Sequence, residues 1–242
     1  MKMTAFARRC AKEILRDPLN LLFGLGFPAG LLLLLSLLQA NIPVPLFEIQ
    51  HLAPGIAVFG LSFISLFSAT LIAKDRESAF LQRLYTLPLS PSDYILGYML
   101  PLLPIAVAQS AVCYFIAIGL GLPLTWNILP AILLILPTSL LFISLGLMFG
   151  SILNVKQVGG VCGALLTNVS AWLSGVWFDL ELTGPVFHKI AALLPFMHGV
   201  ELERSIIAGD FGQILAHLLP VLFYTTVMTS TAILVFLRNM RR

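Results

Sequence analysis

The residues best suited to binding a partner lie in one short polar segment, Lys74–Asp93. Six of the 25 charged residues of the chain fall in this segment, which interrupts long apolar stretches on either side. The segment begins with three consecutive charges, Asp75, Arg76 and Glu77, and Arg83 follows within two helical turns. It is too short to form a domain and too polar to dissolve in lipid. We therefore expect a docking element that faces water.

An amphipathic helix is predicted from about Asp75 to Tyr85. Its apolar side chains are spaced so that they share one face of a helix, with Arg76, Glu77 and Arg83 beside that face. These apolar residues are Phe80, Leu81, Leu84 and Tyr85. Pro88 ends the helix because the residue before a proline avoids the helical conformation. Such a face suits the groove of a partner protein, and a helix lying on lipid headgroups is an equally good interpretation.

Other residue types that carry chemistry do not form a recognisable site. The histidines are His51, His188, His198 and His217, and the cysteines are Cys10, Cys113 and Cys162. Their spacing matches neither a metal site nor a disulfide framework, so we predict neither. The phosphate-binding motif GxxxxGK[ST] does not occur, so we expect no ATP hydrolysis by this chain through such a loop.

The elements that must position these residues are membrane-spanning helices. Hydrophobic residues make up 59% of the chain and charged residues 10%, with a mean hydropathy of +0.98, whereas soluble domains carry roughly a quarter charged residues. Apolar runs long enough to cross a bilayer as helices recur along the chain. The predicted fold class is an all-α polytopic membrane protein, a single domain over residues 1–242. Its six spans are expected at about 19–40, 53–73, 92–118, 127–151, 158–178 and 213–237.

The charges orient these spans. Both termini, the 74–92 loop and Lys156 fall on one side, which carries 12 of the 14 Lys and Arg residues. Only Lys189 and Arg204 fall on the other side. Because cytoplasmic loops are enriched in Lys and Arg, we expect both termini to be cytoplasmic in a cell membrane.

Shorter elements flank the spans. Residues 5–16 are basic and are interpreted either as an interfacial helix or as a simple positive anchor. Asp17 and Pro18 are expected to cap the start of span one. Between spans five and six, the apolar pieces 185–194 and 199–208 are too short to cross, so we expect external re-entrant or interfacial helices.

Three stripes of residues recur every fourth position within the spans. Small residues at this spacing let helices approach closely, either within one subunit or between two subunits. They are Gly26 and Gly30 in span one, and Gly159, Gly163, Thr167, Ala171 and Gly175 in span five. Phe59, Phe63 and Phe67 form an aromatic stripe in span two. The first interpretation of this stripe is packing in the core or against lipid, and the alternative is that it lines a path for an apolar substrate.

Two regions carry motifs of a known family. The first region contains Asp75-Arg76-Glu77, Arg83-Leu84, Thr86-Leu87-Pro88-Leu89 and Gly97. The second contains Leu173-Ser174-Gly175, Trp177-Phe178, Leu194-Pro195-Phe196 and Arg204. In both regions the chain resembles the type-2 ABC exporter permeases, although Gln82 stands where the family usually carries an acid and Asp179 where it usually carries a proline.

The resemblance implies the membrane subunit of an ATP-driven exporter, with no catalytic site of its own. Two permease subunits, identical or homologous, would form the pathway, and two copies of a separate ATPase subunit would bind ATP and Mg. The 75–85 helix would contact the ATPase, spans one and five would form the subunit interface, and the segment with Trp177, Phe178, Pro195 and Phe196 would close the external end.

The cargo is expected to be apolar or amphipathic, such as a drug, lipid or peptide-like molecule, because the spans contain few charges. No nucleic acid partner is expected. The alternative from another class is a six-span secondary transporter or channel that works without ATP. Such carriers usually show intramembrane charges or an inverted repeat, and the sequence shows neither. A membrane scaffold without transport is a third possibility.

Overall fold

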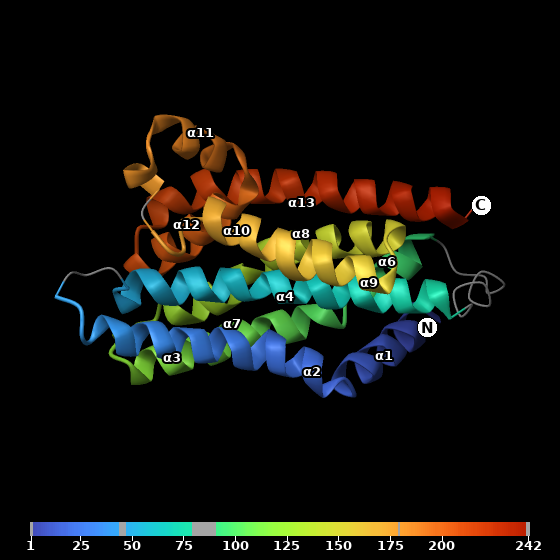
Figure 1. The fold of residues 1–242 in the computed structure, drawn as a ribbon, viewed down its shortest axis with the longest axis horizontal. Helices are drawn as coiled ribbons and strands as arrows, with labels where there is room; N and C mark the ends of the chain where they lie inside the picture. The colour runs from blue at the N-terminus through green and yellow to red at the C-terminus, as the bar shows by residue number, and fades with distance from the viewer. Residues whose placement is uncertain (1, 44–46, 79–90, 179, 241–242) are drawn as a thin grey trace.

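The computed structural model describes residues 2–43, 47–78, 91–178 and 180–240. All regular structure in these residues is helical, and most of the helices run along one common axis (Figure 1). Among the described residues, five helices are long and apolar enough to cross a membrane. They are Pro18–Gln39, Ile49–Glu77, Asp93–Gly119, Ile128–Ile152 and Phe211–Arg238. The predicted all-α multi-pass fold is confirmed, and these helices correspond to the first four predicted spans and the sixth.

The helices begin and end close to the predicted boundaries. In chain order they are α1 (Lys2–Leu15), α2 (Pro18–Leu21), the π-helical η1 (Leu22–Gly26), α3 (Phe27–Gln39), α4 (Ile49–Glu77), α6 (Pro91–Met99), α7 (Leu102–Gly119), α8 (Ile128–Ile152) and α13 (Phe211–Met240). Asp17 caps α2 as predicted, because its carboxylate accepts a hydrogen bond from the Asn20 backbone N–H at 3.2 Å and Pro18 occupies the first helical position.

The central helix of the bundle is α4, which packs against α3, α7, α8 and α12. Its most apolar stretch is 89% buried, a larger share than in any other candidate span. Two glycines let α8 approach it closely. A Cβ atom on Gly146 would lie 2.2 Å from the carbonyl oxygen of Ser65, and one on Gly150 would lie 2.4 Å from that of Ala69. Only a residue without a side chain fits at these two positions.

The predicted fifth span, 158–178, differs most from expectation. It folds as α9 (Val155–Val158), the π-helical η2 (Gly159–Leu166) and α10 (Thr167–Leu173), and it is not among the five candidate spans. The helix ends at Leu173 because Gly175 adopts the left-handed conformation, with φ of 72°, which breaks a right-handed helix.

Two short helices follow the 3₁₀ turn η3 (Leu180–Thr183), as the apolar pieces 185–194 and 199–208 predicted. The first, α11 (Pro185–Leu193), is mostly exposed, and only Ala191 is buried. The second, α12 (Pro195–Ala208), buries one face against α4, α8 and α13. The segment between the last two long helices is therefore folded onto the bundle.

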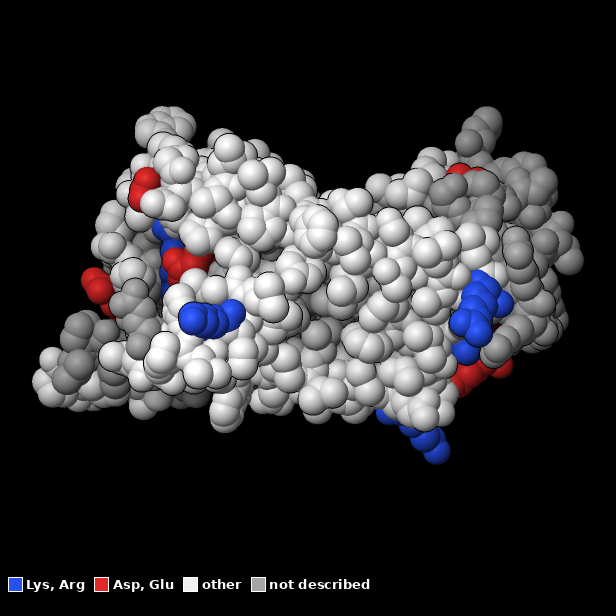
Figure 2. Space-filling view, turned by 90° about the horizontal axis from the view of Figure 1, so that it is seen from above, with Lys and Arg blue, Asp and Glu red and all other residues white. Residues whose placement is uncertain are grey.

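Charged side chains mark the two ends of the bundle. Figure 1 shows α1, α9, the last turn of α4 and the C-terminal end of α13 at one end, called here the termini end; α11 and α12 lie at the opposite, far end. Figure 2 shows that the acidic and basic side chains visible on one face lie toward these two ends, with an uncharged belt between them. This distribution is typical of a protein whose middle faces lipid.

Candidate functional site

A cluster of buried charges holds the last turn of α4 at the termini end. Asp75 is only 1% exposed. Its carboxylate accepts hydrogen bonds from the Arg9 guanidinium of α1, one of them at 2.7 Å, and from the Tyr98 hydroxyl of α6 at 2.8 Å. Charge-assisted bidentate contacts of this kind are strong and geometrically specific. Asp75 thus ties three helices together.

The next two residues bind the neighbouring helix ends. The Arg76 guanidinium donates to the carbonyl oxygens of Gly150 at 2.8 Å and Leu153 at 3.2 Å. A helix leaves its last carbonyls without backbone partners, so Arg76 satisfies the C-terminus of α8. The Glu77 carboxylate accepts from the Val155 N–H at 2.9 Å, where α9 begins.

These contacts place Asp75, Arg76 and Glu77 within α4, whereas the sequence led us to expect a separate helix from about Asp75. The remaining residues of the predicted docking helix lie outside the described residues: Phe80, Leu81, Arg83, Leu84 and Tyr85. The structure describes this part of the chain only up to Ser78, just past the end of α4. The end of α4 is joined there to α1, α6, α8 and α9.

The phenylalanine stripe of α4 is buried in an aromatic row that crosses three elements. Phe63 packs against Phe23 and Phe27, at centroid distances of 6.2 and 5.2 Å. Phe59 meets Phe63 edge-on at 5.8 Å and Trp177 at 5.3 Å. The row therefore runs from the first span to the turn after α10, one of the predicted gate positions.

Phe67 lies on the same stripe, next to the backbone of η1. It is 2% exposed, and a Cβ atom on Gly24 would lie 2.4 Å from its ring. All three stripe phenylalanines are thus packed in the core of the single chain, which agrees with the first interpretation of the stripe.

The small-residue stripes are only partly available to a second subunit. Gly30 and Gly159 are exposed, and no heavy atom lies within 4 Å of a Cβ placed on either one. Gly26 is also exposed, and Gly163 is half-buried beside Leu66. The remaining members face the chain's own core: Thr167, Ala171 and Gly175. A π-helical turn contains an additional residue, so η2 rotates the stripe from the surface into the bundle.

The far end contains a cavity of about 720 Å³ beside the predicted gate. Trp177 and Phe178 line it, whereas Pro195 and Phe196 are buried at the start of α12. Phe178 packs on Phe187 of α11 at 6.4 Å, and Phe196 packs on Phe142 of α8 at 5.8 Å. The predicted gate residues are therefore divided between a cavity wall and the core.

Arg204 fixes this end. Its guanidinium donates to the Gly175 carbonyl oxygen at 2.9 Å, to Glu201 at 2.8 Å and to the His51 carbonyl oxygen at 3.4 Å. These bonds join α12 to the turn after α10 and to the start of α4. The carbonyl oxygen of the buried Gly175 is one of these acceptors, so the turn that contains Gly175, Trp177 and Phe178 is tied to Arg204.

Sequence reasoning missed a buried carboxyl group on α12. Glu203 is fully buried and accepts a hydrogen bond from the Tyr114 hydroxyl of α7 at 2.7 Å. Its second carboxyl oxygen has no hydrogen-bond partner among the described residues. Burial raises the pKa of Glu203 from 4.5 to about 8, against the smaller opposing effect of the Tyr114 hydroxyl. Spacing could have revealed it, because Glu203 follows Phe196 and Val200 on one helical face.

A pair of histidines also meets at this end, 19 positions apart in the sequence. The Nδ1 atoms of His198 and His217 are 3.1 Å apart, and His198 Nε2 lies 3.0 Å from the Ala192 carbonyl oxygen. Within the described residues, no group of three His, Cys, Asp or Glu side chains is placed to hold a metal ion. The pair therefore joins α12 to α13.

Comparison with known proteins identifies the family. A family model described as ABC-2 type transporter matches residues 1–208, which include every element from α1 to the end of α12. No curated protein matches the chain significantly.

Proposed function

Because this chain belongs to the ABC-2 type transporter family, we propose that it is one of two permease subunits of an ATP-driven exporter. Each permease works with one copy of a separate ATPase subunit, and ATP and Mg are bound there. Both termini face the cytoplasm in a cell membrane, and the cargo is apolar or amphipathic. The family match, over a helical bundle with an uncharged belt, is the observation that carries this proposal.

The cluster at the end of α4 supports a role in transmitting force from the ATPase. Asp75, Arg76 and Glu77 bind α1, α6, α8 and α9. The residues that directly follow them are proposed to dock the ATPase through Phe80 and Leu84. A displacement of this docking segment would then reach several helices together, because buried charge-assisted hydrogen bonds resist separation.

The exposed glycines support a dimer interface built from the first and fifth predicted spans. Gly30 and Gly159 lie open at the surface, and exposed leucines surround Gly30 on α3, including Leu33, Leu34 and Leu37. Small residues within a lipid-facing surface let a second helix approach closely. The aromatic row reaches the surface at Phe23 and Phe27, which are 41% and 42% exposed, and through them it would border the cargo path between the two subunits.

A sixth crossing is part of the proposal. The segment Val155–Leu173 comprises α9, η2 and α10 with four, eight and seven residues. At about 1.5 Å per residue, these 19 residues extend roughly 28 Å, close to the hydrocarbon thickness of a bilayer. The following segment with α11 and α12 then lies on the external side, where it closes the pathway.

Co-purification tests the proposed partner. Phe80→Asp and Leu84→Asp should each abolish binding of an ATPase encoded beside this chain, whereas Leu124→Asp should not. Leu124 is a matched control because it is 79% exposed in the loop before α8. Normal ATPase binding by both variants would contradict the docking assignment. Transport by the reconstituted chain alone, without ATPase or ATP, would favour the secondary transporter instead.

Crosslinking and bulky substitutions test the dimer. Gly30→Trp and Gly159→Trp add side chains into open space of the single chain, so the monomer should fold while the pair separates. Gly119→Trp, at another open glycine, should leave the pair intact. Dimers that persist at wild-type abundance in both variants would refute this interface.

A further inference from the structure

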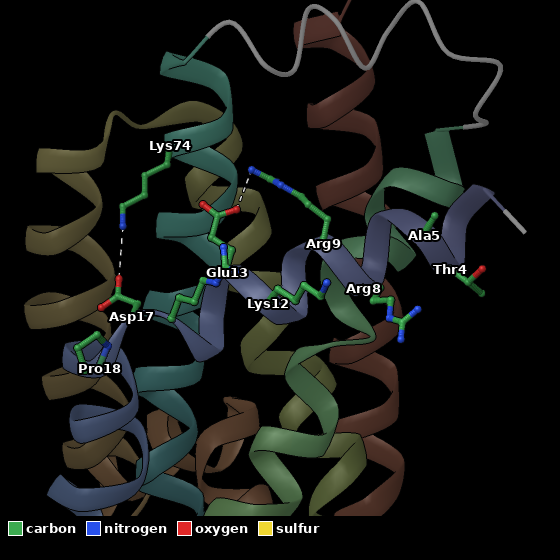
Figure 3. A pocket seen from close by; sticks show the side chains of 10 residues that line it. Thr4, Ala5, Arg8, Arg9, Lys12, Glu13, Asp17, Pro18 and Lys74 are labelled. Atoms are coloured by element: carbon green, nitrogen blue, oxygen red, sulfur yellow. Dashed lines mark hydrogen bonds and ion pairs between the residues drawn. The ribbon is translucent and has the colours of Figure 1, made fainter.

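A second cavity, of about 1010 Å³, lies at the termini end beside α1 and the start of α2 (Figure 3). Five basic side chains and two acidic ones line it, a formal excess of three positive charges. The basic residues are Arg8, Arg9, Lys12, Arg16 and Lys74, and the acidic ones are Glu13 and Asp17. Such an excess favours an anionic ligand.

Two of the five cations already have partners. Arg9 binds Asp75 and Glu13, and Lys74 lies 3.5 Å from the Asp17 carboxylate. Among the described residues, Arg8, Lys12 and Arg16 make no side-chain hydrogen bond or ion pair, and all three are exposed. They recur every fourth position, with Arg16 one residue past the end of α1 and its N–H still bonded to the Lys12 carbonyl oxygen, so they form one cationic stripe. In Figure 3, Arg8 and Lys12 project from α1 at the edge of this cavity.

The opposite face of α1 packs against the bundle and so fixes the position of this stripe. Phe6, Cys10 and Ile14 are buried, and Phe6 meets the Tyr98 ring of α6 edge-on at a centroid distance of 4.9 Å. A Cβ atom on Gly97 would lie 2.3 Å from the Phe6 ring. The buried face thus packs α1 against the bundle, and the cations Arg8 and Lys12 lie on the opposite, exposed face of the helix.

The surface changes from charged to apolar directly beyond the stripe. Leu15, Leu19 and Leu22 are 63%, 62% and 62% exposed, and they continue from the end of α1 into the first span. A small soluble anion would bind the cations but would leave these exposed leucines uncovered. A phospholipid matches both halves, because its phosphate can bind cations at the membrane surface while its acyl chains cover leucines below.

We propose that this cavity binds the headgroup phosphate of an anionic phospholipid through Arg8, Lys12 and Arg16, with an acyl chain lying on Leu15, Leu19 and Leu22. The site anchors α1 to the inner membrane surface and is separate from the cargo path proposed above.

Native mass spectrometry of the full chain in detergent tests the site with phosphatidylglycerol, phosphatidylcholine and glycerol phosphate as probes. Wild type should retain phosphatidylglycerol in preference to phosphatidylcholine. The triple variant Arg8→Gln, Lys12→Gln, Arg16→Gln should bind it roughly a hundredfold more weakly, about fivefold for each cation removed. Arg238→Gln is the matched control, since it removes an exposed cation from the last turn of α13 at the same end.

Two further measurements distinguish a lipid phosphate from a soluble phosphate, and a single substitution replaces the triple variant if that variant misfolds. Leu19→Ser should weaken phosphatidylglycerol binding, and glycerol phosphate should not displace the lipid. Displacement at concentrations comparable to the lipid would assign the cavity to a soluble anion and overturn the proposal. If the triple variant aggregates, Lys12→Gln alone decides: a fivefold loss supports the site, and unchanged affinity overturns it.

Discussion

The buried carboxyl group of Glu203 makes the stability of the bundle depend on pH. In the folded chain its pKa is raised from 4.5 to about 8. Below pH 4.5 the group is protonated in both the folded and the unfolded states. Between these values the unfolded chain releases the proton and the folded chain keeps it, so the free energy of unfolding falls as pH rises.

The size of this effect follows from the two pKa values. Each pH unit between 4.5 and 8 lowers the free energy of unfolding by about 1.4 kcal/mol. Over the whole window from pH 4.5 to pH 8 the loss reaches ~5 kcal/mol, and at higher pH it levels off. Glu203→Gln keeps the shape of the side chain but cannot ionise. It should therefore unfold at a higher temperature than wild type by an amount that grows from near zero at pH 4.5 to roughly 10–20 °C at pH 8.

Thermal unfolding of both proteins in one detergent, from pH 4.5 to 9, measures this difference. Glu48→Gln serves as the control, because Glu48 is exposed at the same end of the bundle and should show no such trend. Tyr114→Phe removes the hydrogen-bond donor that favours the ionised carboxylate. It should therefore raise the pKa of Glu203 in the folded chain further, and the loss of stability should level off at a higher pH. A Glu203→Gln variant whose unfolding temperature follows that of wild type at every pH would refute the buried neutral acid.

Three further outcomes follow from the packing. Gly146→Ala should lower the free energy of unfolding by about 1–3 kcal/mol or more, because its Cβ would overlap the backbone of α4, whereas Gly119→Ala, with open space around it, should change little; denaturant titration measures both. Cys10 is fully buried and burial raises its pKa to about 12, so mass spectrometry should detect maleimide labelling only after unfolding. Asp75→Asn should cost about 2 kcal/mol in the same titration, since the half-exposed Arg9 loses a charged partner but keeps another.

Local signals in the sequence predicted the parts of the fold that depend on local interactions. Long apolar runs located five long helices, and the Asp17-Pro18 pair located the start of α2. The end of the predicted fifth span was misplaced by five residues because it depends on the left-handed backbone of Gly175. A glycine permits a left-handed backbone, but the presence of a glycine in the sequence does not indicate that this conformation is adopted.

Contacts between residues far apart in the sequence could not be predicted from such local signals. The Arg9–Asp75 pair joins residues 66 positions apart, and Tyr114–Glu203 joins residues 89 apart. A charged side chain in a sequence is normally assigned to the aqueous phase, so its charge gives no reason to expect a buried Glu203. Only the packing of α12 against α4, α8 and α13, with the Tyr114 hydroxyl of α7 bonded to Glu203, shows that this carboxyl group is enclosed. The roles proposed for the exposed glycines and for Phe80 and Leu84 stay predictions.

The two π-helical segments have a consequence for comparing relatives of this chain. In η1 the Phe27 N–H bonds to the carbonyl oxygen of Leu22, five positions back, so each such segment holds one residue more than an α-helix of the same rise. Relatives with uninterrupted α-helices should therefore show one-residue gaps opposite Leu22–Gly26 and Gly159–Leu166. An alignment that forbids gaps within spans would pair non-equivalent residues on one side of each segment, and it would blur the small-residue periodicity at the surface where a second copy is proposed to bind.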